Sequence, residues 1–310
     1  MADRVDLAVD LGRGLHLRSP VMLASGTFGY GFDAPLVDRS AVGAIVTKGT
    51  TPRPRDGSEP TRIAETPSGM LNAIGLQNPG VEHVAREFAP LWASWNLPVI
   101  VNVAGDSIDD YVAVARTLDR VPGVAGLELN ISCPNVARGL QFGIDADLAA
   151  ELTAAVRQVT RLPLMVKLTP NVTDIVAIGK AVETAGADAV SAINTYVGMA
   201  IDVGRRRPVL SRTSGGLSGP AIKPLALQAV WQLAAELSIP VIGIGGITTS
   251  TDALEFLMAG AAAVQLGTVN YVRPQAARDV HEGIADYMRL NGFQVLRALP
   301  LRPAREPARV

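Results

Sequence analysis

Short runs of consecutive hydrophobic residues recur eight times along the chain, and each is followed by a segment with helical character. Such short, nearly uninterrupted apolar runs are typical of parallel strands that are covered on both faces. The expected strands are Val21–Gly26, Ala44–Gly49, Val99–Ala104, Gly126–Ser132, Leu164–Thr169, Ala189–Thr195, Val241–Gly246 and Ala263–Thr268.

The segments between these runs carry helix signals. Ser107 and Asp110 form a Ser-x-x-Asp cap, and Gly260 stands where a helix is expected to end. Four helices are the clearest, at Ser107–Arg120, Asp147–Arg161, Asp174–Ala185 and Ser250–Ala259. Eight alternations of strand and helix predict an α/β protein of the (β/α)8 TIM-barrel class. A doubly wound open sheet is the structural alternative, which periodicity alone does not exclude.

Three further segments modify this barrel. Val5–Val9 and Leu15–Leu17 alternate around Gly12–Gly14, which predicts an N-terminal β-hairpin at the bottom of the barrel. Two connections are long: Thr51–Gln77 after the second barrel strand and Val197–Pro224 after the sixth. Connections of this length within a compact domain are usually functional lids or interfaces.

Composition narrows the class of protein. Of the 310 residues, 48% are hydrophobic and 18% are charged, which suits one large domain over residues 1–310. A net charge of -1 argues against nucleic acid as a partner. No signal peptide is evident, and no apolar run reaches the roughly 20 residues of a membrane span. We expect a soluble, cytoplasmic protein.

Polar residues gather where the predicted strands end. In a barrel of parallel strands, these ends meet at one mouth, where the chemistry takes place. Amide and ammonium groups at five of the ends suggest a polar, ring-shaped ligand, and no cluster of metal ligands accompanies them. In chain order the ends are Ser25, Lys48, Asn102, Asn130, Lys167, Asn194–Thr195, Gly245–Gly246 and Gly267–Thr268.

Side-chain alternation extends this prediction one layer deeper. If Asn130 points into the mouth, Glu128 does so from below it, and Lys167 points inward from the next strand. An isolated buried carboxylate is costly. We therefore expect Glu128 and Lys167 to pair beneath the ligand.

Glycines mark the last two strand ends, in Gly243–Gly246 and Leu266–Thr268. Barrels of this class commonly bind phosphate with the loops after strands seven and eight. Tight turns alone would also explain either pair of glycines, but their coincidence favours phosphate. The run Gly215–Gly219 is a weaker signal, for a flexible loop or for a backbone N–H that contacts the same ligand.

The single cysteine of the chain, Cys133, lies in the segment Asn130–Asn135, directly after a predicted strand. A lone cysteine is usually a small buried hydrophobe. At a strand end among asparagines, it is better interpreted as a reactive group. The histidines fall elsewhere and are expected to be surface or packing residues: His16, His83 and His281. Cys133 is thus the best candidate proton acceptor in the mouth.

Together these residues resemble dihydroorotate dehydrogenase of class 1, and most closely the catalytic subunit of class 1B. The resemblance runs from about the first strand to the last, and the blocks around Asn72 and Cys133 are its most specific parts. The matching stretches are Leu23–Gly26, Thr47–Thr51, Gly69–Gly80, Asn130–Asn135, Val166–Leu168, Asn194–Thr195 and Gly245–Gly246.

The resemblance implies a (β/α)8 barrel that holds FMN at its mouth and oxidises dihydroorotate to orotate in pyrimidine (UMP) biosynthesis. It implies Cys133 as the general base and Lys48 as a second catalytic group, stabilising the charge that grows on the flavin. The implied FMN contacts are Ser25, Lys48, Gly49, Asn102, Asn130, Lys167, Ile193, Gly219, Gly245, Gly246, Gly267 and Thr268. The implied substrate contacts are Lys48, Asn72, Ala73, Ile74, Gly75, Leu76, Asn130, Asn194 and Thr195.

The classes of this family differ in base and electron acceptor. Class 2 enzymes use serine and carry an N-terminal extension, class 1A reduces fumarate directly, and class 1B passes electrons to NAD through a separate subunit with FAD and an iron–sulfur cluster. Arg55–Gly80 and Arg138–Gly143 favour class 1B. With one cysteine, this chain cannot build such a cluster. We expect a homodimer or a heterotetramer with that subunit, and Arg205–Arg207 is either a solvated loop or a contact with it.

Other functions stay open on the residues alone. One is a class 1A-type enzyme that uses fumarate, and another is an FMN barrel acting on a different dihydropyrimidine or on dihydrouridine in tRNA. A third is a phosphate-binding aldolase or isomerase without flavin. The last is a non-catalytic partner in an electron-transfer complex, in which Cys133 is merely buried.

Overall fold

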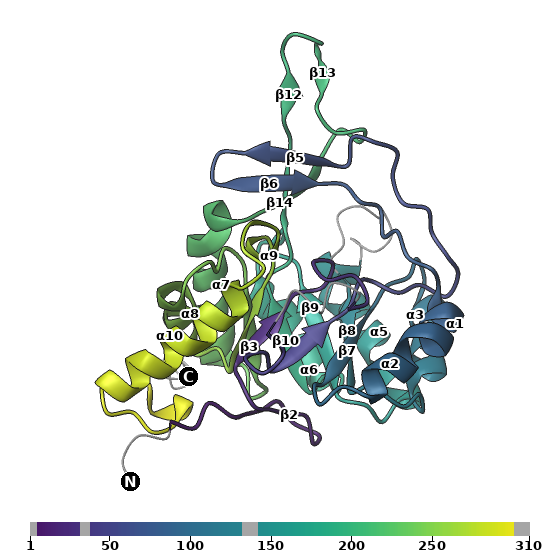
Figure 1. Ribbon diagram of the computed structural model, residues 1–310. Helices are drawn as coiled ribbons and strands as arrows, with labels where there is room; N and C mark the ends of the chain where they lie inside the picture. Colours follow the sequence, from purple (N-terminus) through teal and green to yellow (C-terminus); the bar gives the residue numbers. More distant parts are fainter. Residues whose placement is uncertain (1–4, 32–37, 132–141, 301–310) are drawn as a thin grey trace, which may run out of the picture.

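Eight parallel strands close into a barrel in the computed structural model, which describes residues 5–31, 38–131 and 142–300 (Figure 1). Going round the barrel, the strands follow one another in sequence order. They are β3 (Val21–Leu23), β4 (Ala44–Val46), β7 (Val99–Val103), β8 (Gly126–Asn130), β9 (Leu164–Leu168), β10 (Ala189–Ala192), β15 (Val241–Ile244) and β16 (Ala263–Leu266). Each begins where the sequence predicted a strand, so this fold class is confirmed.

Closure distinguishes the barrel from an open doubly wound sheet. The last strand pairs with the first, with Val264 opposite Val21 and Leu266 opposite Leu23. All eight barrel strands are fully buried along their length, because helices cover them outside and side chains fill the space inside. This burial on both faces is the physical reason for the uninterrupted apolar runs in the sequence.

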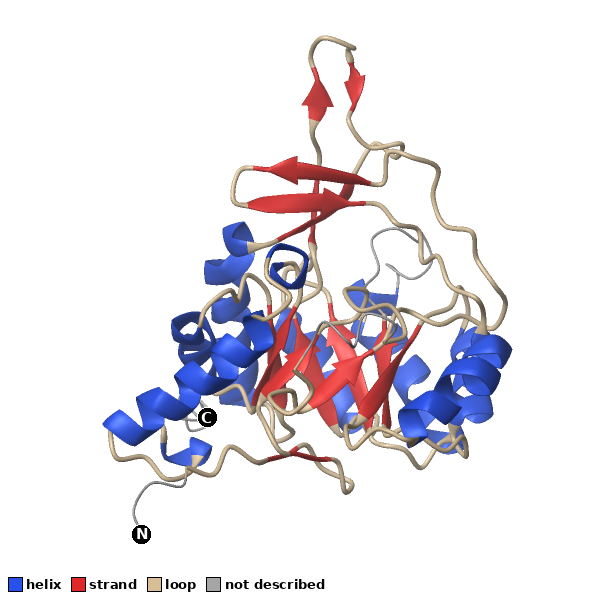
Figure 2. Cartoon of the chain, in the orientation of Figure 1, coloured by secondary structure: helices blue, strands red, loops and turns tan. Residues whose placement is uncertain are grey.

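Helices surround the barrel, as Figure 2 shows. Side-chain oxygens cap two of them at the predicted start signals: Ser107 accepts from the Asp110 N–H, and Asp174 accepts from the Val176 and Ala177 N–H groups. In a third helix the cap lies one residue before the predicted start at Ser250, where Thr249 forms a capping box with Asp252. The α-helices are α1 (Val81–His83), α2 (Ala89–Ala93), α3 (Ile108–Leu118), α5 (Ala146–Val159), α6 (Ile175–Thr184), α7 (Lys223–Glu236), α8 (Ser250–Met258), α9 (Val269–Val272) and α10 (Ala276–Leu290). A π-helical segment η2 (Val84–Phe88) and two short 3-10 helices, η3 (Pro220–Ile222) and η4 (Leu296–Ala298), accompany them.

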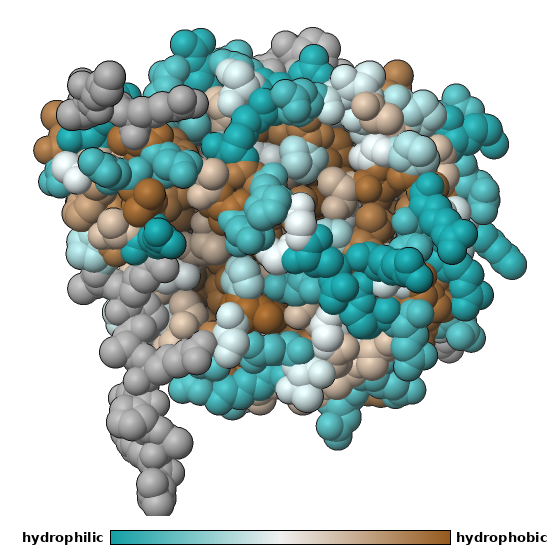
Figure 3. Space-filling model, turned by 90° about the horizontal axis from the view of Figure 1, so that it is seen from below, coloured by the Kyte–Doolittle hydropathy of each residue, from teal (hydrophilic) through white to brown (hydrophobic). Residues whose placement is uncertain are grey.

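The predicted N-terminal hairpin closes the bottom of the barrel. β1 (Val9–Asp10) pairs with β2 (His16–Leu17), and the leucines Leu11, Leu15 and Leu17 are buried. They pack in one cluster with apolar side chains from the lower part of the barrel: Met22, Ala44, Val46, Ile100, Met165, Ala189, Ile242 and Ala263. Seen from below, the surface mixes hydrophilic residues with hydrophobic patches (Figure 3). The hairpin thus acts as a plug that keeps water from the lower barrel.

The two long connections meet above the opposite end of the barrel and form one antiparallel sheet. The first supplies β5 (Ile63–Thr66) and β6 (Gly69–Asn72), and the second supplies β11 (Tyr196–Gly198) and β14 (Gly215–Ser218), in the order β11-β14-β6-β5. A further hairpin of β12 (Ile201–Asp202) and β13 (Arg207–Pro208) projects beyond this sheet at the top of Figure 1. The residues that the sequence assigned to lids therefore roof the barrel mouth together.

Within the described ranges, no helix combines the length and the apolar character that crossing a membrane requires.

We expect Leu17→Ala to destabilise the fold, because Leu17 is 1% exposed and its truncation leaves a cavity beneath the barrel. Large-to-small changes at such positions cost about 2–5 kcal/mol. The measurement is the urea midpoint followed by circular dichroism, with Leu290→Ala as the control because Leu290 is 86% exposed. Equal midpoints for the two variants would contradict the plug.

Candidate functional site

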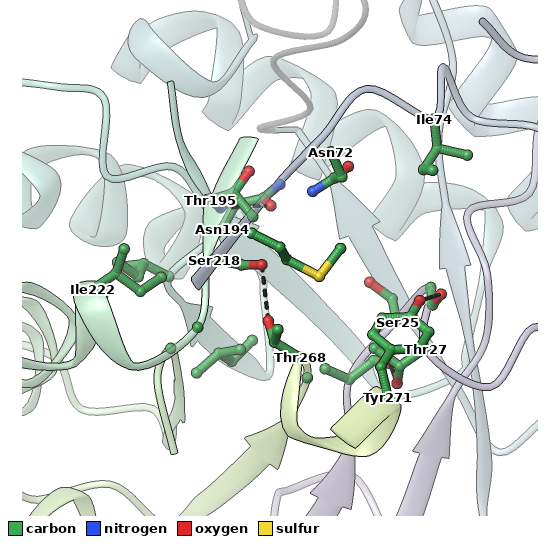
Figure 4. Close-up of a pocket in the computed structure, with 18 of the residues that line it drawn as sticks. Ser25, Thr27, Asn72, Ile74, Asn194, Thr195, Ser218, Ile222, Thr268 and Tyr271 are labelled. Atoms are coloured by element: carbon green, nitrogen blue, oxygen red, sulfur yellow. Dashed lines mark hydrogen bonds between the residues drawn. The ribbon is translucent and has the colours of Figure 1, made fainter. Parts of the chain in front are cut away.

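A cavity with about 1210 Å³ of empty space, which includes its open rim, lies at the C-terminal ends of the barrel strands. Its floor comes from the residues that follow or end these strands, and its roof comes from the four-stranded sheet. Figure 4 shows Asn72 and Ser218 from the roof near Asn194 and Thr268 from the strand ends.

The structure brings nearly all predicted site residues to this one cavity. Those that line it are Ser25, Lys48, Gly49, Asn72, Ile74, Gly75, Leu76, Asn102, Asn130, Lys167, Ile193, Asn194, Thr195, Gly219, Gly245, Gly246, Gly267 and Thr268. Ala73 is an exception: it is fully buried in a small cluster with Leu71 and Leu210 and does not line the cavity. Ala73 directly follows β6 and continues its alternation, so it faces the same side as Leu71, away from the cavity. Cys133 lies outside the described residues.

The charged side chains among the described lining residues are all positive. Lys48 follows β4 and Lys167 lies on β9, and no Asp or Glu stands among the described lining residues. The Lys167 ammonium donates to the Ser25 hydroxyl at 3.2 Å, so it is held at the barrel wall. Two cations in a partly enclosed cavity, with no carboxylate among its described lining residues, favour an anionic ligand, because low dielectric surroundings strengthen their attraction.

Amide side chains complete the polar lining from two directions. On the floor, the Asn194 amide donates to the Asn130 side-chain oxygen at 3.3 Å, and the Asn194 oxygen accepts from the Thr195 N–H. From the roof, the Asn72 amide donates to the Gly216 carbonyl at 3.2 Å across the β6–β14 pair. Each amide is therefore oriented by a protein contact and can present its other groups to a ligand.

Glu128 points into the barrel as strand alternation predicted, but its described contacts differ from the predicted ion pair with Lys167. The carboxylate accepts from Asn102 at 2.8 Å, from Ser191 at 2.8 Å and from Gln265 at 3.0 Å. The strand register explains the difference: Lys167 lies opposite Asn130, whereas Glu128 lies opposite Met165, one layer lower. Three neutral donors thus stabilise the buried charge.

The glycines after β15 are required for steric reasons, which the sequence alone did not show. Gly245 has φ +130 and Gly246 has φ +74, and a Cβ on Gly246 would lie 2.7 Å from the Cβ of Lys223. These residues allow the loop to pass close to the start of α7, while both still line the cavity. Gly215–Ser218 form strand β14 rather than a flexible loop, so that interpretation of the glycine run is wrong.

An ion-pair network fixes the same loop. Lys223 lies 2.6 Å from Asp252 and 2.9 Å from Glu255, and the other Asp252 oxygen accepts from Thr248 and from the Thr249 N–H. Burial opposes the ionisation of Asp252, yet the hydrogen bonds from Lys223, Thr248 and Thr249 outweigh it and hold the pKa of Asp252 well below its usual value. The hydrogen bonds to Asp252 and Glu255 raise the pKa of Lys223.

Sequence reasoning missed several lining residues at the rim and roof. Ser218 accepts from Thr268 at 2.8 Å, and the exposed Tyr271 donates to the Gly26 carbonyl at 2.9 Å (Figure 4). The others are Ala24, Gly26, Thr27, Ile63, Met70, Ile222, Ile244, Ile247, Thr248 and Val269. Ser218 and Thr248 stand close to predicted glycines, and this was the available signal. Ile63 and Met70 reach the cavity only because the roof folds over it.

The three histidines lie away from the cavity, as predicted. His16 is in the bottom hairpin, 3.6 Å from Asp10, and His83 packs edge-on against Phe88. His281 is half-buried, shares a 2.9 Å hydrogen bond with Ser19, and has its pKa lowered by burial.

The fold and cavity define a TIM barrel whose mouth has a polar lining suited to an anionic ligand. The sequence matches the family model "Dihydroorotate dehydrogenase" over residues 7–288, and the chain belongs to this family.

The chain is similar to proteins named dihydroorotate dehydrogenase B (NAD(+)), catalytic subunit, in several bacteria. It is 52% identical to that of Geotalea daltonii over 95% of this chain and 97% of the relative, and 52% identical to that of Desulforamulus reducens over 94% and 96%. The identity to that of Porphyromonas gingivalis is 50%, over 94% and 95%.

Membership of this family implies a flavin cofactor, and the described residues fit one. The side-chain oxygen of Asn102 is buried at the cavity and has no hydrogen-bond partner among the described residues, so it can accept from an N–H of a ring. The Lys48 and Lys167 ammonium groups and the backbone of the glycine loops suit the negative charge of a flavin phosphate or of a reduced ring.

We expect Asp252→Asn to lower stability at neutral pH, because it removes an anion that the fold stabilises. Since the folded-state pKa of Asp252 is depressed, this contribution is present above the unfolded pKa of about 3.9 and is lost as the pH falls below it. Urea midpoints of the native chain and the variant should therefore converge on acidification. Asp286→Asn, at an exposed Arg289 pair, is the control. A pH-independent difference for Asp252→Asn would contradict this account.

Proposed function

We propose that this chain oxidises dihydroorotate to orotate for pyrimidine biosynthesis, as one catalytic domain over residues 1–310 with FMN at the barrel mouth. The observation that carries this proposal is the cavity itself, where two ammonium groups and four asparagines converge without a carboxylate among the described lining residues. A planar anion that carries both N–H and C=O groups matches this lining. The names of the similar proteins support the same reaction.

FMN would be held by residues from the strand ends. In this proposal Lys167, Ser25 and Thr268 give polar contacts, and backbone N–H groups of the last two loops hold the phosphate. When bound, the flavin supplies an acceptor for a hydride, which no side chain offers. The full set is Ser25, Lys48, Gly49, Asn102, Asn130, Lys167, Ile193, Gly219, Gly245, Gly246, Gly267 and Thr268.

Dihydroorotate would lie between the floor and the roof. Asn130 and Asn194 from the floor and Asn72 from the roof offer paired donors and acceptors to its imide and carboxylate. The roof sheet also excludes water from the ring, which strengthens these contacts. The proposed contacts are Lys48, Asn72, Ile74, Gly75, Leu76, Asn130, Asn194 and Thr195. Because Ala73 does not line the cavity, we do not include it.

Two residues would carry the chemistry. Cys133, three residues beyond Asn130 in the sequence, takes the proton from C5 of dihydroorotate while C6 loses a hydride with its two electrons. A thiol has an ordinary pKa of about 8.5, nearer to neutral pH than an alcohol. The Lys48 ammonium stabilises the negative charge that develops in the cavity during this step.

We further propose that the electrons pass to NAD through a partner subunit with FAD and an iron–sulfur cluster, in a heterotetramer built on a homodimer of this chain. The names of the similar proteins, which include NAD(+) and the words catalytic subunit, support a divided enzyme. This chain has one cysteine, so the cluster must belong to another chain. Direct reduction of fumarate is the alternative.

We expect Cys133→Ser to reduce turnover by about two to four powers of ten, the range of general-base effects, while FMN stays bound. The measurement is anaerobic reduction of the yellow flavin band by dihydroorotate in a stopped-flow instrument. The control is the FMN content of each preparation. A variant that reduces its flavin at the native rate would refute Cys133 as the base.

The electron acceptor can be tested with the purified chain. We expect this chain to be yellow, to lose its flavin absorbance when dihydroorotate is added, and to form no NADH by itself. Adding the subunit that copurifies from the native host, identified by its FAD and iron content, should restore NADH formation. Steady turnover of the isolated chain with fumarate would overturn the NAD proposal and favour the class 1A alternative. A colourless chain that does not take up FMN would overturn the flavin enzyme itself.

A further inference from the structure

A layer of polar side chains crosses the barrel between its apolar base and the cavity. Its centre is the Glu128 carboxylate, which is 0% exposed, and its donors come from three other strands. Asn102 on β7 gives its amide to one carboxylate oxygen, and Ser191 on β10 and Gln265 on β16 donate to the other. A charge buried so deeply is expensive, whereas a neutral acceptor could serve the same donors at lower cost. This layer therefore calls for a functional explanation.

The carboxylate decides how the Asn102 amide is turned. Three donors converge on the two oxygens of Glu128, so Glu128 acts only as an acceptor and the NH₂ group of Asn102 must face it. The Asn102 oxygen then has to point away. It is buried, has no hydrogen-bond partner among the described residues, and lies 3.1 Å from a Cβ built on Gly49 at the cavity.

A buried oxygen without a partner is unfavourable unless a ligand supplies a donor. Gln265 also has an unpartnered oxygen, but Gln265 does not line the cavity, whereas Asn102 does. Asn102 is thus the member of the layer that connects the carboxylate below with a ligand above. The oxidised flavin ring carries one N–H, on its pyrimidine part, and this is a suitable donor.

We infer that Glu128 is a positioning residue for the cofactor: it fixes the Asn102 amide so that its oxygen accepts a hydrogen bond from the N–H of the flavin ring. This inference rests on the proposed flavin function. The buried Glu128 carboxylate does not line the cavity, yet it determines where the cavity floor presents a hydrogen-bond acceptor.

Glu128→Gln tests this with little change of volume. The oxygen of the new amide can still serve Ser191 and Gln265, so its NH₂ group faces Asn102. Two NH₂ groups cannot bond each other, and Asn102 must turn over and offer NH₂ to the flavin N–H. We expect the apoprotein of E128Q to bind FMN about 10–100-fold more weakly than the native apoprotein. The bound FMN should also show a shifted absorbance spectrum.

Restoring the pattern should restore binding. In the double variant E128Q/N102D, the new amide donates to one oxygen of the Asp side chain and leaves the other oxygen as an acceptor at the cavity. We expect FMN to bind about tenfold more tightly to this variant than to E128Q, whereas N102D alone, with two facing carboxylates, binds worse than the native chain. Such non-additivity is the signature of direct coupling. A purely structural role predicts no rescue.

The control is Glu183→Gln, because Glu183 accepts backbone N–H bonds from Ser238 and Ile239 away from the cavity. It should leave the FMN dissociation constant unchanged. If E128Q does not fold, Asn102→Ala removes the acceptor directly and should weaken FMN binding by a similar factor. Native-like FMN affinity and spectrum in E128Q or N102A would overturn the inference while leaving the flavin function intact. Failure of the native apoprotein to bind FMN would overturn the proposed function instead.

Discussion

Closure of the eight-stranded barrel is the constraint on which the rest of this molecule depends. Once β16 pairs with β3, the interior must be filled by the inward-facing side chains. The lower part is filled with apolar residues and closed by Leu11, Leu15 and Leu17 from the hairpin. The upper part is polar, with Glu128 at its centre and Lys167 and Asn130 above it. The division between stability at the bottom and chemistry at the mouth follows from this layering.

The cavity depends on the barrel for its floor and on two distant segments for its roof. β6 and β14 come from connections that are far apart in the sequence, and they pair with Asn72 opposite Gly216. Gly216 allows this approach, since a Cβ there would lie 2.1 Å from the Thr195 hydroxyl oxygen. Backbone pairing therefore joins the two halves of the roof, and it places the Asn72 amide above the floor asparagines.

The sequence was most informative where periodicity and burial coincide. All eight strands and the four clearest helices lie where apolar runs and cap residues predicted them, with boundaries that differ by a few residues. The candidate site was also largely predictable, because parallel strands bring their C-terminal ends together whatever the details of packing. Errors arose where one residue's environment depends on register or on non-local contacts. Glu128 has amide and hydroxyl donors instead of Lys167, and Ala73 faces a cluster on the side of the roof away from the cavity.

The sequence by itself determined the alternation of parallel strands and helices, the N-terminal hairpin and the ring of amides and ammonium groups, because these follow from local pattern and from strand direction. Closure of the barrel rather than an open sheet was decided by the pairing of β16 with β3. Tertiary structure alone decided the roof, the tight contact of Gly246 with Lys223, and the orientation of Asn102 by a carboxylate on the next strand. These features depend on distances between segments that are remote in the chain. Side-chain alternation determines which way a side chain points, but only tertiary packing determines which residues it contacts.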